Sequence, residues 1–250
     1  MHILRFLMLS LSCLIPLAAV ADEVRVAVAS NFAATLHRLA EDFSAATGHE
    51  VLISAASTGK HYAQISNGAG FDVFLAADAT RPQRLEQEGI GVPGSRFVYA
   101  EGRLVLWVPG AQTLVDARSY LSQMANRRLA IANPRLAPYG QAARQVLESW
   151  QLWTTLRPRL VQGENVSQAL HYVASGNAEA GIVALTQVLS LAGARYGSYR
   201  VIPADLHAPI SQQALLLREH PAAEAFLDYL RGARARALIR EAGYGLPGPA

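Results

Sequence analysis

Four times along this chain, an apolar run typical of a strand ends in small polar residues where a helical pattern begins. The four junctions are Ser30-Asn31 after residues 24–29, Ser57-Thr58-Gly59 after 51–55, Tyr139-Gly140 after 129–132, and Asn165-Val166 after 160–161. A helix N-terminus has backbone N–H groups without intrahelical partners and carries the positive end of the helix dipole. Such an end binds anions, and small or hydroxyl residues there add donors without blocking approach. Four ends that meet would hold a small oxyanion with no formal positive charge nearby.

The alternation of apolar runs and helical segments predicts the fold class. After the first apolar run, Leu36, Leu39, Ala40 and Phe43 recur at helical spacing. Near-continuous apolar strands that alternate with helices indicate an α/β fold, with mainly parallel sheets that helices cover on both faces. Ligands of such sheets bind beyond the carboxyl ends of the strands, where the four junctions fall. We expect strands at residues 24–29, 51–55, 73–77, 104–108, 129–132, 160–161, 181–184 and 213–217.

The length of the chain allows two lobes. No internal repeat and no low-complexity linker divides the sequence, so the lobes are argued from length and from where a ligand would sit. The expected break lies at residues 100–102, after the Pro93-Gly94 turn, and a return crossing is expected at 203–209. This gives a first lobe of residues 22–100 plus 207–250 and a second lobe of residues 101–206.

The first 21 residues have the pattern of a cleaved secretory signal. Arg5 supplies a positive start, residues 6–17 are mostly apolar, and Ala19-Val20-Ala21 is a small-residue cleavage site. The alternative is a membrane anchor, but the apolar run is short for one. Cys13 is the single cysteine and lies inside this segment, with Ser10 where a lipoprotein site prefers leucine. We therefore expect export to the periplasm, and a soluble mature protein without disulfides or cysteine metal ligands.

Composition excludes several classes of function. The net charge is only +3, 16% of residues are charged, and Lys60 is the single lysine. This scattered charge does not indicate nucleic-acid or membrane-surface binding. The histidines show no H-E-x-x-H spacing, and no G-x-S-x-G, Walker or G-x-G-x-x-G motif follows a strand. We expect no enzyme activity, no cofactor and no bound metal cation.

Several motifs make a resemblance specific. They are Ala29-Ser30-Asn31-Phe32, the segment 57–65 (STGKHYAQI), the segment 67–78 (NGAGFDVFLAAD), the segment 133–140 (NPRLAPYG), Pro93-Gly94-Ser95-Arg96-Phe97, Leu104-Val105-Leu106-Trp107 and the terminal Ala242-Gly243-Tyr244. Together they resemble the periplasmic molybdate-binding proteins of ABC importers, over essentially the whole mature chain. The resemblance implies a two-lobed, type II solute-binding fold with the anion between the lobes. It also implies a monomer that delivers molybdate, and tungstate as well, to a membrane permease.

The resemblance also implies site residues. The family binds its oxyanion with hydroxyls and backbone N–H groups, without arginine or lysine. Its motifs place Ser30 and Asn31 at the first contact and Thr58 at the second, with Ser57 as the alternative. Tyr139 and Val166 fall at the contacts from the second lobe.

One position departs from the family. Some members use a tyrosine hydroxyl where this chain has Ala184, so one donor is missing here, and the Tyr139 hydroxyl is the candidate replacement. Selection against sulfate would rest on cavity size, and tungstate, nearly equal to molybdate in size, would be discriminated poorly.

Two other functions are consistent with parts of the sequence. A ferric-ion carrier of similar architecture would use Tyr139, Tyr196 and Tyr199 with a histidine, but it lacks a carboxylate and paired tyrosines in one loop. A secreted hydrolase would bring together Ser30 or Ser57 with His61 and Asp78, but the sequence lacks a nucleophile elbow. Lys60 could steer anions inward, or it could be an ordinary solvated lysine.

Overall fold

The computed structural model describes residues 22–110, 113–124, 126–191 and 197–247, so the expected signal segment 1–21 lies outside the described residues. Within these residues, ten strands form two five-stranded sheets. The strands are β1 (Glu23–Ala29), β2 (Glu50–Ala56), β3 (Val73–Ala76), β4 (Phe97–Gly102), β5 (Leu104–Val108), β6 (Leu129–Ala132), β7 (Leu160–Gly163), β8 (Ala180–Ala184), β9 (Ser198–Val201) and β10 (Ile210–Leu216). The helices are α1 (Ala33–Thr47), α2 (Thr58–Ser66), α3 (Thr80–Gln87), α4 (Ala117–Ser122), α5 (Pro138–Ser149), α6 (Trp153–Leu156), α7 (Val166–Ala174), α8 (Leu185–Ser190), α9 (Pro221–Arg231) and α10 (Ala233–Glu241), with short 3-10 turns η1 (Ser30–Phe32), η2 (Arg157–Arg159) and η4 (Ala204–Leu206).

The two sheets repeat one plan. Their strand orders are β2-β1-β3-β10-β4 and β7-β6-β8-β5-β9. In the first sheet β2, β1 and β3 are parallel, β10 is antiparallel to β3, and β4 is antiparallel to β10. The second sheet has the same pattern, with β5 as its reversed strand. In each sheet, four of the five strands therefore run in the same direction, which confirms the expected mainly parallel orientation. The fifth strand is reversed, so the hydrogen-bonded strand pairs include both parallel and antiparallel ones.

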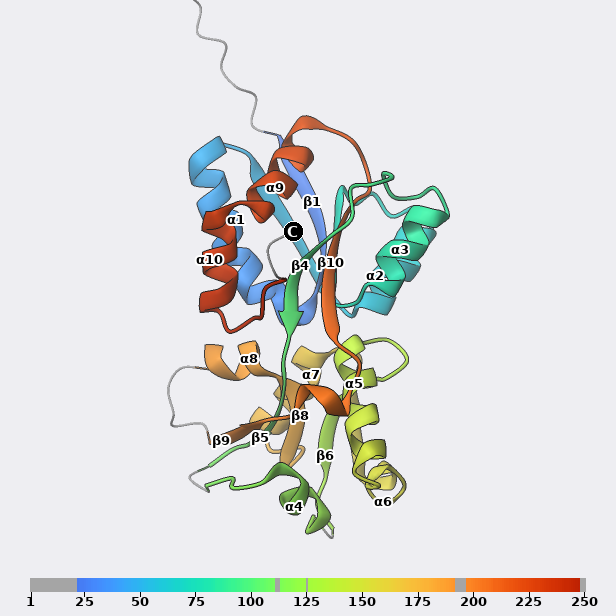
Figure 1. The fold of residues 1–250 in the computed structure, drawn as a ribbon, viewed down its shortest axis with the longest axis vertical. Helices are drawn as coiled ribbons and strands as arrows, with labels where there is room; N and C mark the ends of the chain where they lie inside the picture. Colours follow the sequence, from blue (N-terminus) through green and yellow to red (C-terminus); the bar gives the residue numbers. More distant parts are fainter. Residues whose placement is uncertain (1–21, 111–112, 125, 192–196, 248–250) are drawn as a thin grey trace, which may run out of the picture.

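The sheets define two lobes that lie end to end (Figure 1). We call the first sheet with its helices lobe I and the second sheet with its helices lobe II. The chain passes from lobe I to lobe II between β4 and β5, and it returns between β9 and β10. Each of the eight expected strands overlaps a strand of the structure. β4 and β9 were not expected from the sequence, and each lies at an edge of its sheet.

Lobe I has an apolar layer on each face of its sheet. Val24, Val26 and Val28 of β1 pack against α1, α9 and α10, whereas Ala27 faces the layer of α2 and α3. Figure 1 shows these helix groups on opposite sides of the sheet. The period-two alternation of side chains along β1 produces this division.

Lobe II has one large core, and it extends into lobe I. Its buried cluster includes Ala29 at the end of β1 and Ala77 just after β3. The carboxyl ends of these two lobe I strands are therefore packed against lobe II. The apolar contact between the lobes at Ala29 and Ala77 thus lies beside the strand-to-helix junctions of lobe I.

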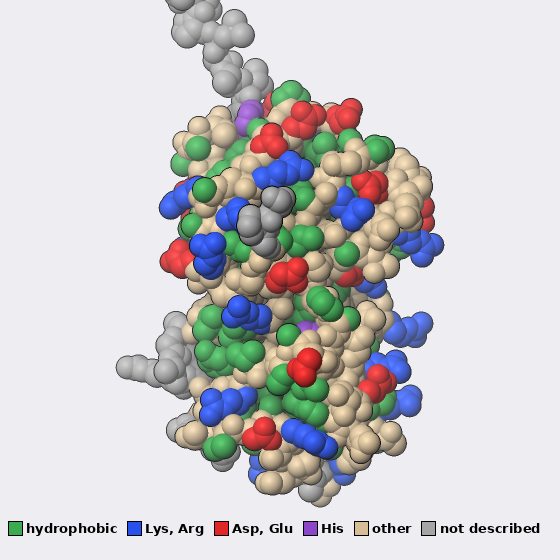
Figure 2. Space-filling model, viewed as in Figure 1, with side chains coloured by type: hydrophobic (Ala, Val, Ile, Leu, Met, Phe, Trp, Pro, Cys, Tyr) green, Lys and Arg blue, Asp and Glu red, His purple; other side chains and the backbone are tan. Residues whose placement is uncertain are grey.

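The surface carries mixed charge. On the face in Figure 2, Lys and Arg side chains are interspersed with Asp and Glu over both lobes. Among the described residues, no helix is both long enough and apolar enough to span a bilayer.

Candidate functional site

Four helical segments begin on facing sides of the junction between the lobes. η1, which leads into α1, and α2 begin at the carboxyl ends of β1 and β2 in lobe I, and α5 and α7 follow β6 and β7 in lobe II. The facing sides touch: Gly59 N donates to Leu136 O at 2.8 Å, and Ser167 Oγ donates to Ser30 O at 3.2 Å. The structure thus brings the segments of the five expected contacts to one place. Those five are all buried, at 1–8% exposed: Ser30, Asn31, Thr58, Tyr139 and Val166.

Asn31 is held by its side chain. Its Nδ2 donates to Gln212 Oε1 at 2.8 Å and to the Tyr244 hydroxyl at 3.1 Å. An amide nitrogen has two hydrogens, so both are already bonded within the protein. What Asn31 can offer an anion is therefore its backbone N–H.

The two hydroxyls at the start of α2 have different roles. Ser57 is the N-cap residue, and its Oγ accepts from Lys60 N at 3.4 Å. Thr58 Oγ1 accepts from Ala77 N at 3.1 Å. That bond fixes the position of the Thr58 oxygen and leaves its hydroxyl proton free to donate.

Tyr139 places its backbone N–H at the start of α5 and its hydroxyl at the chain crossing. It is the second residue of α5, after Pro138, so its N–H has no carbonyl partner within the helix. The ring reaches the chain crossing, where a Cβ added to Gly102 would overlap the Tyr139 hydroxyl. This buried hydroxyl has no partner among the described residues, and burial raises the pKa of Tyr139 well above its usual value. The hydroxyl is therefore positioned against β4.

Val166 is the first residue of α7. The N-cap is Asn165, whose Oδ1 accepts from Gln168 N at 3.0 Å. Asn165 is thus a helix cap, while the backbone N–H of Val166 is one of those without an intrahelical partner.

At Ala184 the side chain offers no donor. Ala184 is the fully buried N-cap residue of α8. The nearest hydroxyl along the chain is that of Thr186, which donates to the Tyr244 hydroxyl at 3.2 Å.

Lys60 is paired rather than free. Its Nζ lies 3.0 Å from Glu164 Oε1 on lobe II, and the two side chains are 50% and 37% exposed. An exposed pair of this kind contributes roughly 0–1 kcal/mol. The pair nevertheless neutralises the single lysine of the chain beside the site.

Two pockets open between the lobes. One is lined by Asn31, Thr35 and Arg38 of lobe I and by Thr186 and Gln187 of lobe II, and the other includes Gly59, Arg81, Arg135 and Leu136. Of the five expected contacts, only Asn31 lines either pocket. Among the described residues, no group of three or more His, Cys, Asp or Glu could hold a metal ion.

The four strand-to-helix junctions were predictable from the sequence, but the side chains that support them were not. Gln212 and Tyr244 bond to the Asn31 side chain. Ser167 Oγ donates to Ser30 O, and Gln187 Nε2 in turn donates to Ser167 Oγ at 2.6 Å. The terminal motif that contains Tyr244 was visible in the sequence. Nothing local indicated its partner, which lies 213 residues away.

Two α/β lobes that meet where helix N-termini face one another have the architecture of proteins that close around a solute. The profile of the family "Bacterial extracellular solute-binding protein" matches residues 24–245, and the chain belongs to this family. Its members are binding proteins, not enzymes.

The individual relatives of this chain have names that specify a ligand. The chain is 48% identical to the molybdate-binding protein ModA of Azotobacter vinelandii over 93% of this chain and 94% of that one. It is 43% identical to ModA of Rhodobacter capsulatus, over 91% and 90%. The solved structure of the periplasmic molybdate-binding protein of Azotobacter vinelandii superposes with a TM-score of 0.85 at 42% identity, covering 90% of this chain and all of that one.

One titratable group lies directly behind the site. His61, in α2, is fully buried, and its ring centroid is 5.6 Å from that of Phe71 and 6.4 Å from that of Phe74. Burial lowers the pKa of His61 below its ordinary value of 6.5. The folded protein therefore binds this proton more weakly than the unfolded chain, whose histidine takes up a proton as the pH falls through about 6.5.

We expect the free energy of unfolding to decrease between pH 7.5 and pH 5.5, because the unfolded state gains this proton more readily than the folded state. His61→Gln removes the group and should flatten that decrease. The measurement is chemical denaturation at both pH values. His37→Gln, on the exposed face of α1, is the matched control. Parallel pH profiles for the wild type and His61→Gln would contradict the assignment.

Proposed function

We propose that this protein captures molybdate outside the cytoplasm and delivers it to the permease of an ABC importer. The observation that carries the proposal is the set of four helical starts, two from each lobe, whose neighbours touch across the junction. An anion placed there meets backbone N–H groups and helix dipoles from both sides. The two molybdate-binding relatives support molybdate as the anion.

We assign five contacts. Ser30 and Thr58 contribute hydroxyls, and Asn31, Tyr139 and Val166 contribute backbone N–H groups. Each hydrogen bond to a charged oxygen contributes about 1.5–3 kcal/mol, and several together offset the hydration that a buried dianion loses. The hydroxyl that Ala184 lacks is not replaced by Tyr139 in this assignment, because the Tyr139 hydroxyl lies against Gly102.

The proposal includes the organisation of the whole chain. We infer that residues 1–21 are a signal removed on export to the periplasm, and that the mature protein is a monomer. Lobe I consists of residues 22–100 plus 207–250, and lobe II of residues 101–206, except that β4 of the lobe I sheet extends to Gly102. The two crossings between the sheets support this division. The closed form would be what the permease recognises.

The first prediction concerns selectivity. Donors fixed by helices cannot close well around sulfate, which is smaller, whereas tungstate is close to molybdate in size. Calorimetric titration of the anion-free mature protein should give tight one-to-one binding of molybdate and tungstate, and no heat with sulfate. Silence toward molybdate would refute the proposed function. Tungstate binding hundreds of times weaker would refute selection by size. A visible absorption band on adding ferric ion would favour the iron carrier.

A second prediction separates Thr58 from Ser57. Thr58→Val removes the proposed anion donor, so molybdate affinity should fall about tenfold or more. Thr58→Ser keeps the hydroxyl and should restore most of it. Ser57→Ala removes a helix cap and should lower the free energy of unfolding by about 1 kcal/mol, with a smaller effect on affinity. Calorimetry and denaturation on all three variants test this. The reverse order of affinities would assign the contact to Ser57.

A third prediction concerns the close approach at Gly59. A Cβ added there would lie 2.7 Å from Leu136 O, across the junction. Gly59→Ala should therefore hinder closure and weaken molybdate binding at least about tenfold, while helix propensity leaves the stability of the anion-free protein equal or slightly higher. Gly70→Ala is the control, because its nearest neighbour would be a flexible arginine end at 3.9 Å. Wild-type affinity in Gly59→Ala would show that the lobes do not need this contact.

A further inference from the structure

The hydroxyl of Tyr244 bonds to both lobes. It donates to Asn31 O at 2.7 Å, and it accepts from Asn31 Nδ2 at 3.1 Å and from Thr186 Oγ1 at 3.2 Å. Asn31 belongs to lobe I, and Thr186 is the second residue of α8 in lobe II. A phenol has one proton and two lone pairs, so this hydroxyl is fully used.

The same bonds fix the orientation of Asn31. With Nδ2 donating to Gln212 and Tyr244, the amide cannot rotate without losing two bonds. Gln212 Oε1 also accepts from the Tyr99 hydroxyl at 3.3 Å. These groups are all at least nine-tenths buried, and an unmade bond among them would leave a polar atom without water. The network therefore fixes the segment that carries the first proposed anion contact.

The tail that carries Tyr244 is anchored at the chain crossing. Gly245 and Glu101 of β4 exchange two backbone hydrogen bonds, of 2.9 Å and 2.8 Å. The Tyr244 ring lies 5.2 Å from that of Phe32, in η1. Tyr244 is thus held by lobe I, and its bond to Thr186 spans the junction.

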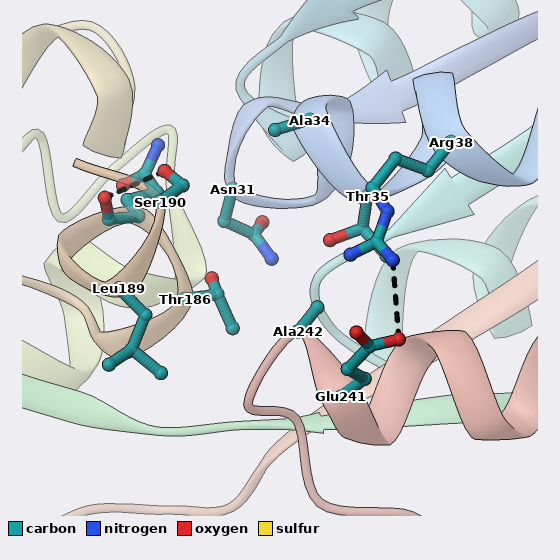
Figure 3. Close-up of a pocket in the computed structure, with 10 residues that line it drawn as sticks. Asn31, Ala34, Thr35, Arg38, Thr186, Leu189, Ser190, Glu241 and Ala242 are labelled. Carbon is teal, nitrogen blue, oxygen red and sulfur yellow. Dashed lines mark hydrogen bonds and ion pairs between the residues drawn. The ribbon is translucent and has the colours of Figure 1, made fainter. Parts of the chain in front are cut away.

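The bond to Thr186 depends on how the lobes meet. Asn31 and Thr186 extend from opposite sides into a pocket of about 180 Å³ between the lobes (Figure 3). If lobe II moves away, Thr186 leaves Tyr244 while the bonds of Tyr244 to Asn31 remain. The Thr186 bond is therefore made only when the lobes are together.

We propose that Tyr244 is a positioning residue for anion binding, which holds Asn31 from lobe I and stabilises the closed arrangement through Thr186 of lobe II. This inference rests on the proposed function, because it takes closure around an oxyanion as the binding event. Tyr244 does not touch the anion. It acts through Asn31 and through the lobe that closes.

The test compares Tyr244→Phe, Thr186→Val and the double variant. Titration calorimetry with molybdate gives Kd, stopped-flow dilution gives the dissociation rate, and thermal unfolding of the anion-free protein gives stability. Thr186→Val removes only the bond between lobes, so Kd should rise about fivefold through faster dissociation, with unchanged stability of the anion-free protein. Tyr244→Phe should raise Kd about tenfold or more. The double variant should bind no more weakly than Tyr244→Phe, because both changes remove the same bond.

Tyr229→Phe is the matched control. Its hydroxyl donates to Asp42 Oδ2 at 2.8 Å, on the far side of lobe I, and its Kd should stay within about twofold of the wild type. A merely structural role would lower the unfolding temperature of Tyr244→Phe but leave Kd unchanged in both single variants. That result, or multiplying effects in the double variant, would overturn the proposal.

The outcome for the wild type separates the two proposals. If the wild type does not bind molybdate but binds tungstate or sulfate, the proposed function fails, and the same variants are compared with the anion that does bind. If the wild type binds none of the three, both proposals fail.

Discussion

Backbone N–H groups at the start of a helix need a hydrogen-bond partner from outside the helix. The site between the lobes depends on where the fold places these N–H groups. η1 and α2 begin on one side of the junction between the lobes, and α5 and α7 begin on the other. The strand direction shared within each sheet brings the helix starts to one edge, because helices that follow parallel strands begin at the carboxyl ends. A small residue then allows the sides to approach, because a Cβ added to Gly59 would lie 2.7 Å from Leu136 O on the other lobe. That geometry presents N–H donors from both lobes without using a basic side chain.

The sequence predicted most of this because its signals are local. Eight strands showed as apolar runs, and all four junctions showed as small residues before a helical pattern. β4 and β9 were missed because both pair at sheet edges and carry polar residues; three of the four residues of β9 are exposed. The network around Asn31 was missed for a different reason. Its partners are 181 and 213 residues away, and only the folded chain brings them together.

Residue type alone did not determine the role of each group at the site. Tyr139 was a candidate hydroxyl donor from sequence, yet its ring extends to Gly102, whereas its backbone N–H lies in the first turn of α5. Ser57 and Thr58 could not be separated in the sequence, and in the structure each hydroxyl accepts one backbone N–H, from Lys60 and from Ala77, and keeps its own proton. The asparagine at 31 uses its side chain to support the protein. For Asn31, the hydrogen bonds already made by the side chain leave the backbone N–H as the group that a ligand can use.

The ion pair between Lys60 and Glu164 has a practical consequence. Lys60 is the single lysine of the whole chain, so it carries the only side-chain amine that acylating reagents can modify. That amine lies on lobe I and contacts lobe II at 3.0 Å. A fluorophore coupled there would sit between the two lobes, and its emission would change as they separate. The natural sequence thus already provides an attachment point for an optical sensor, without an engineered cysteine.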